Sequence, residues 1–163
     1  MLTARRIKQG ECELYKKLRL KSLQDSPGAF GSTYESALKR SPESWIEQTD
    51  GCSRGSNRAT FLAFKDDRPV GLATVYRLES PADVVELMQF WIAPEFRRKG
   101  AAVVLLDNAM EWASKNNFRA VTAGIMTGNA GAMSFYQKYG FTPESGIVLN
   151  CPGDAAVLIK EAI

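Results

Sequence analysis

Three consecutive cations, Arg97-Arg98-Lys99, stand directly before Gly100 and two alanines. A long apolar stretch at residues 84–92 precedes them and a helical pattern at residues 100–115 follows them, which predicts a strand-to-helix junction. A helix N-terminus presents unpaired N–H groups and a partial positive charge, and small residues let an anion approach the backbone. The junction therefore predicts an anion site suited to a pyrophosphate, although its glycine spacing matches neither a Walker loop nor a dinucleotide-binding fingerprint. The alternative is a solvated run of charge leading into a surface helix.

A second group of residues, further along the chain, could also face a ligand. Asn129 suits the cap of a helix, and Tyr136 lies seven residues later, which is two helical turns. Both side chains can therefore point to one side of that helix, which Gly140 is suited to end. The alternative is that Phe135, Tyr136 and Tyr139 are core aromatics.

The elements that must position these groups follow from the apolar periodicity and the breaks between apolar runs. After a weak first strand come helices, then a hairpin, then a strand–helix–strand–helix–strand order. This order predicts an α+β or mixed α/β fold in which one sheet carries helices on both faces. The predicted strands are residues 2–8, 59–65, 70–78, 84–92, 119–125, 141–150 and 155–161. The predicted helices are residues 11–24, 32–39, a short one from 42 through 46, 100–115 and 130–138, with a loop at 50–57.

Length and composition bound the class of protein. The chain has 163 residues, 45% of them hydrophobic and 24% charged, which fits one soluble domain over residues 1–163. The balance excludes a disordered chain, a collagen and a disulfide scaffold. A net charge of +3 is too small to indicate nucleic-acid binding by itself. The apolar runs fall short of a membrane span and no signal-peptide core precedes the domain, so we expect a cytoplasmic protein that does not bind membranes.

Two features of the composition narrow the chemistry. The chain has no histidine, which removes the usual serine–histidine and cysteine–histidine catalysis and the commonest metal ligand. The three cysteines, Cys12, Cys52 and Cys151, are odd in number and lack C-x-x-C spacing, so we interpret them as reduced structural thiols.

Together the two groups resemble the Gcn5-related N-acetyltransferase (GNAT) superfamily. The loop fits the family pattern R-x-x-G-x-G/A through Arg97, Gly100 and Ala102, with alanine where glycine is common. The later segment fits N-x-x-A-x-x-φ-Y-x-x-x-G-F, in which φ is apolar, through Asn129, Ala132, Phe135, Tyr136, Gly140 and Phe141. Each motif is weak alone. In this order, with a helix and a strand between them, they are specific, and the region from 84 to 141 covers a little over a third of the chain.

The resemblance implies a mostly antiparallel sheet of six to seven strands, splayed at its centre, with acetyl-CoA as co-substrate in the wedge and no metal. The backbone N–H groups of residues 98–103 would hold the pyrophosphate. The backbone of residues 90–92 would pair with the pantetheine like an added strand. Asn129 would bind the pantetheine side and Tyr136 would lie by the sulfur. The expected cofactor-binding residues are Phe90, Trp91, Ile92, Arg97, Arg98, Lys99, Gly100, Ala101, Ala102, Val103, Asn129 and Tyr136.

A thioester is already activated, so an amine can attack it without a covalent enzyme intermediate. A backbone N–H near Ile92 could stabilise the oxyanion, and Tyr136 could protonate the leaving thiolate. Glu86 is the candidate base, because an acid in an otherwise apolar strand should have a raised pKa. The alternative for Glu86 is a structural hydrogen bond or a role in positioning the acceptor, and Glu79 and Asp83 are weaker candidates.

The acceptor is less determined. Phe30, Tyr34 and Glu86 are the candidate substrate-binding residues, and Trp45 is a further candidate for the pocket wall, although for Phe30, Tyr34 and Trp45 core packing is the favoured interpretation. The sequence thus predicts an acetyl-CoA-dependent N-acetyltransferase that acts on a primary amine of a small molecule or peptide. The first alternative is a non-catalytic acyl-CoA-binding or regulatory module on the same fold. The second, a nucleic-acid-binding protein, lacks a recognisable motif. A homodimer would be in keeping with proteins of this family.

Overall fold

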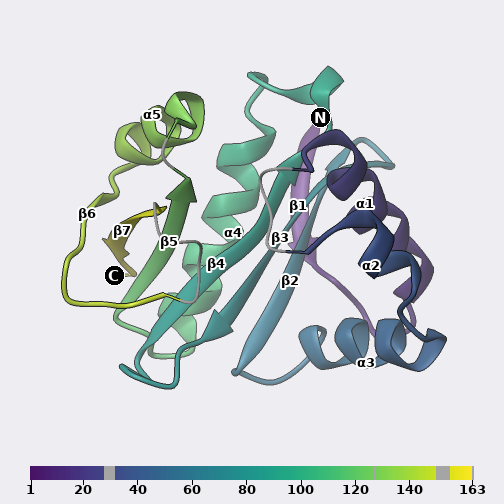
Figure 1. Ribbon diagram of the computed structural model, residues 1–163, viewed down its shortest axis with the longest axis horizontal. Coiled ribbons are helices and arrows are strands. Elements are labelled where there is room, and N and C mark those ends of the chain that lie inside the picture. Colours follow the sequence, from purple (N-terminus) through teal and green to yellow (C-terminus); the bar gives the residue numbers. More distant parts are fainter. Residues whose placement is uncertain (28–31, 127, 150–154, 163) are drawn as a thin grey trace.

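One sheet organises the chain in the computed structural model, which describes residues 1–27, 32–126, 128–149 and 155–162 (Figure 1). Over these residues the sheet has seven strands in the order β1-β2-β3-β4-β5-β7-β6. Each neighbouring pair is antiparallel except β4 and β5, which run parallel. The predicted mixed, mostly antiparallel sheet is therefore confirmed. The strands are β1 (Leu2–Arg6), β2 (Arg58–Lys65), β3 (Arg68–Arg77), β4 (Val84–Ile92), β5 (Ala120–Met126), β6 (Thr142–Pro143) and β7 (Ala155–Glu161).

Helices cover both faces of the sheet, as predicted. On one face, called the α1 face below, Tyr15 and Trp45 pack against Leu62 and Leu72 of the sheet. On the other, called the α4 face, the helical residues pack against the side chains that alternate with these along the strands. The α1 face carries α1 (Cys12–Asp25), α2 (Tyr34–Leu38) and α3 (Pro42–Cys52), and the α4 face carries α4 (Ala101–Lys115) and α5 (Ala130–Tyr139).

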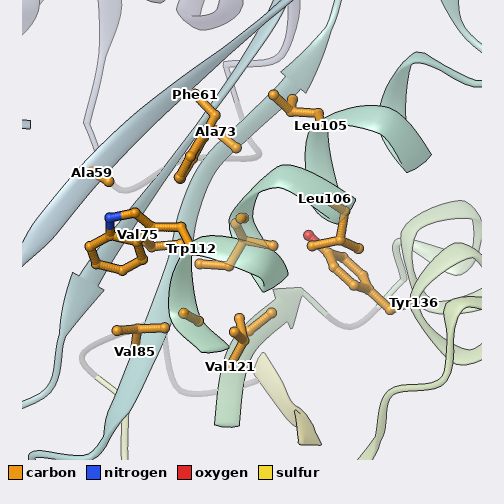
Figure 2. Packing of buried hydrophobic residues seen from close by; sticks show 14 of the residues in the cluster. Ala59, Phe61, Ala73, Val75, Val85, Leu105, Leu106, Trp112, Val121 and Tyr136 are labelled. Carbon is orange, nitrogen blue, oxygen red and sulfur yellow. The ribbon is translucent and has the colours of Figure 1, made fainter. Parts of the chain in front are cut away.

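The packing of α4 fixes the position of the loop that precedes it. Trp112 of α4 lies on the sheet where β2 and β3 present small residues such as Ala59 and Ala73 (Figure 2). Its ring meets Phe61 edge-on at 6.3 Å and stacks on Phe118 at 5.6 Å between ring centroids. Burying each large apolar side chain contributes about 1.5–3 kcal/mol. This helix is therefore a rigid support for the groups at its N-terminus.

The sheet splays at its centre, which confirms the predicted opening. β4 and β5 pair only from Val84 with Ala120 to Glu86 with Thr122, although β4 runs on to Ile92. Figure 1 shows the two strands diverging beyond these pairs. The edge of β4 that faces β5 is consequently left without a neighbouring strand from residue 87 onward.

A β-bulge interrupts β4 inside this unpaired stretch. The register with β3 shifts between Leu72 and Thr74, so that Thr74 pairs with Met88 and Leu72 with Trp91. Gln89 within the bulge has a φ of 57°, a left-handed conformation that few non-glycine residues adopt. Bulges of this kind redirect side chains and backbone groups, and they are common beside active sites.

Two predicted segments were wrong in extent. α3 runs to Cys52 rather than ending near residue 46, because Gly51 continues the helix beneath the Arg58 side chain, where a Cβ would find no room. The strand predicted at 141–150 is a strand only at Thr142–Pro143. Its apolar pattern has another cause, since Ile147 and Leu149 are buried as loop residues. Residue 150 lies outside the described residues.

Candidate active site

The loop before α4 has the backbone geometry of an anion cradle. Arg98 and Gly100 both have positive φ, at 62° and 95°, so the chain bends twice before the helix begins. No described side chain caps the α4 N-terminus, and its first turn contains no acid. The exposed Arg98 and Lys99 stand beside the free N–H groups of residues 101–103. Such successive N–H groups at a helix N-terminus favour a phosphate.

Arg97 does not offer a free guanidinium to this loop. Its Nε donates to the Ile92 carbonyl at 2.9 Å and its Nη2 donates to Asp25 Oδ2 at 2.6 Å. Trp91 Nε1 also donates to Asp25 Oδ2, at 2.9 Å, and this bond, more than the guanidinium, lowers the pKa of Asp25. We call Asp25, Trp91 and Arg97 the Asp25 junction. The sequence predicted Arg97 as a cofactor residue, whereas its contacts tie the loop to α1.

The residues of α5 divide into a cap and a buried phenol. Asn129 is exposed, and its Oδ1 accepts a hydrogen bond from the Ala132 N–H at 3.1 Å, so it caps α5 as predicted. Tyr136 is 7% exposed, with ring centroids of Phe90 at 6.0 Å and Phe141 at 5.2 Å. Figure 2 shows its ring extending from α5 toward Leu106.

The Tyr136 hydroxyl is kept in its protonated form. Burial raises the pKa of Tyr136 far above its ordinary value, because the apolar surroundings disfavour the phenolate. The hydroxyl makes no hydrogen bond to any described residue. A protonated phenol without a fixed partner can donate its proton to a ligand atom.

The backbone of residues 90–92 borders the opening between β4 and β5, and their side chains pack into the cores on the two faces of the sheet. Phe90 packs on Phe135 and Tyr136 of α5, and Ile92 joins the same α4-face core. Trp91 is buried on the α1 face. Since β4 has no β5 partner here, the backbone groups on that edge are available to an extended ligand, in the manner of an added strand, apart from the Ile92 carbonyl that Arg97 occupies.

Glu86 stands at the point where the sheet opens. It forms the last pair between β4 and β5, with Thr122, and lies opposite Tyr76 of β3 on the α1 face. Glu86 is half-buried and has no ion pair or hydrogen bond to the described residues. Burial raises its pKa, as the sequence predicted for an acid in an apolar strand.

A polar network behind the bulge was missed by the sequence analysis. Gln89 Oε1 accepts hydrogen bonds from the buried Tyr15 hydroxyl at 2.8 Å and from Thr74 Oγ1 at 3.2 Å. Thr74 is in turn bonded to Thr60 at 2.8 Å. The network fixes the Gln89 side chain on the α1 face. The available signal was a second polar residue, after Glu86, in an apolar strand.

The candidate wall residues have different outcomes. Trp45 is 1% exposed, meets Tyr15 edge-on at 5.7 Å and lies 4.1 Å from the Arg40 guanidinium, so it is a core residue. Tyr34 begins α2 and is partly buried against the same α1-face cluster. Phe30 lies outside the described residues.

One cavity lies away from the opening of the sheet. It measures about 340 Å³ and lies between α1, the start of β3 and the short 3-10 helix η1 (Pro94–Phe96), with Trp91 and Asp25 in its wall. The described residues contain no group of three or more acids or cysteines that could hold a metal ion. Nor does any helix among them have the length and apolarity to cross a membrane.

Comparison with known families identifies the class of protein. Residues 22–141 match the model of the "Acetyltransferase (GNAT) family", which is more than half of the chain. The chain therefore belongs to the GNAT acetyltransferase family, and the resemblance seen in the two motifs is confirmed.

Individual relatives agree with this assignment. An uncharacterized N-acetyltransferase of Methanocaldococcus jannaschii is 34% identical over 86 residues, which are 50% of this chain and 38% of that protein. The chain thus matches well under two thirds of that relative's length. Two solved structures share the fold over 99% of both chains. One is a GNAT acetyltransferase from Streptococcus pneumoniae, with a TM-score of 0.79 and 21% identity. The other is the PaiA N-acetyltransferase from Thermoplasma acidophilum in complex with coenzyme A, with a TM-score of 0.71 and 20% identity.

Proposed function

We propose that this protein transfers the acetyl group of acetyl-CoA directly to a primary amine of a small molecule or peptide. The observation that carries the proposal is the opening between β4 and β5. It leaves the edge of β4 free between Glu86 on one side and Tyr136 on the other. Membership of the GNAT family supports the reaction class, and the Thermoplasma neighbour, solved with coenzyme A, supports the co-substrate.

The residues at this opening fit an extended acyl-CoA. The free backbone of residues 87–92 would hydrogen-bond the amide-containing arm, and the uncapped N–H groups of residues 101–103 would hold the pyrophosphate. Arg98 and Lys99 add positive charge beside those groups. The thioester supplies an acyl group that is already activated toward an amine.

The residues then divide the proton transfers between them. Glu86, with its raised pKa, accepts the proton that the amine must lose, through an intervening water. A backbone N–H of β4 near Ile92 stabilises the oxyanion that forms on the acyl carbon. Tyr136 donates its hydroxyl proton to the leaving sulfur, and the resulting phenolate takes up a proton from solvent. No covalent intermediate on the protein is needed.

A thermal shift measurement tests the co-substrate first. A ligand at about 100 times its dissociation constant stabilises the folded state by ~2.7 kcal/mol, which raises the melting temperature of a domain of this size by a few degrees. We expect this rise with acetyl-CoA and none with ATP. A cooperative transition that acetyl-CoA leaves unchanged would contradict the proposal. A rise without thiol release from any amine would instead favour a non-catalytic acyl-CoA-binding module.

A further inference from the structure

A second cavity, of about 130 Å³, lies on the α1 face between α1, α2 and the bulge of β4. Arg19 of α1, Arg40 after α2 and Gln89 of β4 line it, together with four small or apolar residues. Its described lining therefore carries two guanidinium groups and no carboxylate. At roughly 30 Å³ for each water in the liquid, the volume suits one small polar group rather than a sugar or a nucleobase.

Arg40 is held in place by neutral groups. Its Nε donates to Ser44 Oγ at 2.9 Å and its Nη2 donates to the Ser44 carbonyl at 3.2 Å. The guanidinium also lies 4.1 Å above the Trp45 ring. These contacts fix the orientation of the guanidinium, which makes no ion pair with a described residue, although its charge also acts on Glu47 of α3.

Arg19 brings a second positive charge to the same cavity from a buried position. It is only 5% exposed, and burial lowers its pKa because desolvation disfavours the charged form. The charge of Arg40 acts on Arg19 in the same direction. An anion bound in the cavity would stabilise both guanidinium groups, and their planar forks match carboxylate and phosphate oxygens.

Gln89 connects this cavity to the opening of the sheet. It lines the cavity and belongs to the bulge, and the next residue, Phe90, packs on Tyr136. Glu86 lies three residues earlier, which is about 10 Å along a strand. A molecule whose amine lies near Glu86 can therefore reach the cavity with its other end.

We propose that the acceptor amine carries an anionic group, a carboxylate or a phosphate, that binds between Arg19 and Arg40. The strand spacing sets the distance from amine to anion at no more than about 10 Å. This inference rests on the proposed function, because it assigns the substrate class of that same site. It excludes polycationic amines as preferred acceptors.

The test is an acceptor series in which chain length is held constant and the terminal charge changes. Thiol release from acetyl-CoA would be measured with 4-aminobutyrate and 6-aminohexanoate, with butylamine and hexylamine as neutral counterparts, and with the diamines putrescine and hexane-1,6-diamine. A further pair, 3-aminopropylphosphonate and 2-aminoethyl phosphate, distinguishes a phosphate-type anion from a carboxylate. A charged hydrogen bond contributes enough for about a ten- to hundredfold difference, so we expect kcat/KM to favour the anionic amines by that factor. Equal values for neutral and anionic amines, or a preference for diamines, would overturn the inference.

Two substitutions sharpen this result. Arg40→Gln should reduce the preference for anionic amines toward equality, while Arg40→Lys should keep part of it. Because Arg40 also packs on Trp45, a second variant avoids the core. Ser36→Glu adds a carboxylate to the cavity wall at the position where glutamate completes a capping box with Thr33, so α2 is retained. We expect Ser36→Glu to reverse the preference toward neutral amines and diamines, and an unaltered preference would count against the site.

A separate measurement distinguishes this inference from the proposed function. If acetyl-CoA raises the melting temperature and neutral amines are acetylated as fast as anionic ones, only the substrate class is wrong. If acetyl-CoA neither raises the melting temperature nor is consumed with any amine, the proposed function itself fails.

Discussion

The two faces of β4 are built differently along the same few residues. On the α4 face, Phe90 and Ile92 join an apolar core, and the polar groups offered to a ligand are mostly backbone N–H groups and one buried phenol. On the α1 face, Glu86 and Gln89 stand among tyrosine, threonine and arginine side chains from several elements. Under the proposed function, the α4 face would hold acetyl-CoA, and the α1 face would bind the acceptor.

The bulge in β4 changes which of its side chains lie on each face of the sheet. An unbroken strand would alternate its side chains strictly between the two faces. The extra residue in the bulge breaks that alternation, so Glu86 and Gln89, three residues apart, both lie on the α1 face, while Phe90 packs on Tyr136 on the other. The comparison between the faces can be tested by substitutions on each.

The largest effect is expected on the α4 face from Tyr136→Phe. General acid catalysis contributes about 10²–10⁴-fold, so kcat should fall at least about a hundredfold while acetyl-CoA affinity stays the same. The measurements are steady-state kinetics and direct binding. Tyr139→Phe is the matched control, because Tyr139 lies on the same helix and loses only an exposed bond to Asp107. Full turnover in Tyr136→Phe would exclude the tyrosine as the acid.

The next largest effect concerns the backbone cradle. Gly100→Ala and Gly55→Ala each place a side chain at a positive φ, 95° and 76°, with no close neighbour, so each should cost about 1–2 kcal/mol of stability. We expect only Gly100→Ala to weaken acetyl-CoA binding, by about tenfold or 1.4 kcal/mol, because its Cβ stands where the pyrophosphate would approach the helix. Isothermal titration calorimetry of both variants measures the affinity for acetyl-CoA. Equal affinities would contradict the placement of the pyrophosphate at this loop.

A smaller and pH-dependent effect is expected from Glu86→Gln on the α1 face. Burial raises the pKa of Glu86, so the folded protein holds this proton more tightly than the unfolded chain does. The stability contribution is present below the ordinary pKa of about 4.3 and is lost as the pH rises through the folded value. Glu86→Gln should therefore melt higher than the parent at neutral pH and equally near pH 4.

The same variant tests catalysis by a separate readout. If Glu86 is the base, the rise of kcat/KM with pH should flatten in Glu86→Gln. A profile that keeps its shape and midpoint, together with the expected gain in stability, would leave Glu86 with a structural or positioning role.

The smallest expected effect distinguishes the contribution of backbone strain at Gln89 to stability from that of its side-chain hydrogen bonds. Gln89→Gly and Gln89→Ala both lose the bonds to Tyr15 and Thr74, but only glycine adopts a φ of 57° without strain. We expect the free energy of unfolding of Gln89→Ala to be about 1 kcal/mol lower than that of Gln89→Gly. Urea denaturation of the two variants measures this difference. Equal stability would mean that the bulge relaxes when the amide is lost.

The sequence predicted the α4 face better because its signals are local. The loop from 97 to 103 and the segment from Asn129 to Phe141 are continuous in the chain, and helix capping and apolar periodicity are short-range effects. The strand from 84 to 92 was predicted with the bounds that the structure has, and so was the strand from 155 to 161.

The α1 face could not be predicted in the same way. Tyr15 and Gln89 are 74 residues apart, and nothing in the sequence indicates that they share a hydrogen bond. The partner of Arg97, Asp25, is 72 residues away, so the motif alone could not indicate that the arginine bonds to it. The helical extension to Cys52 and the burial of Ile147 and Leu149 likewise depend on tertiary neighbours.

The Asp25 junction joins the two halves of the site mechanically. Asp25 is the last residue of α1, the helix that carries Tyr15 and Arg19. Its carboxylate accepts a hydrogen bond from Arg97 in the loop before α4. If a bound ligand restricts this loop, the bond between Asp25 and Arg97 would also restrict α1, and a second ligand would then lose less motion on binding. Such coupling would be reciprocal, because two coupled ligands change each other's affinity by the same factor. We expect the two substrates to bind cooperatively rather than independently, with an affinity for the amine that depends on whether the nucleotide site is filled.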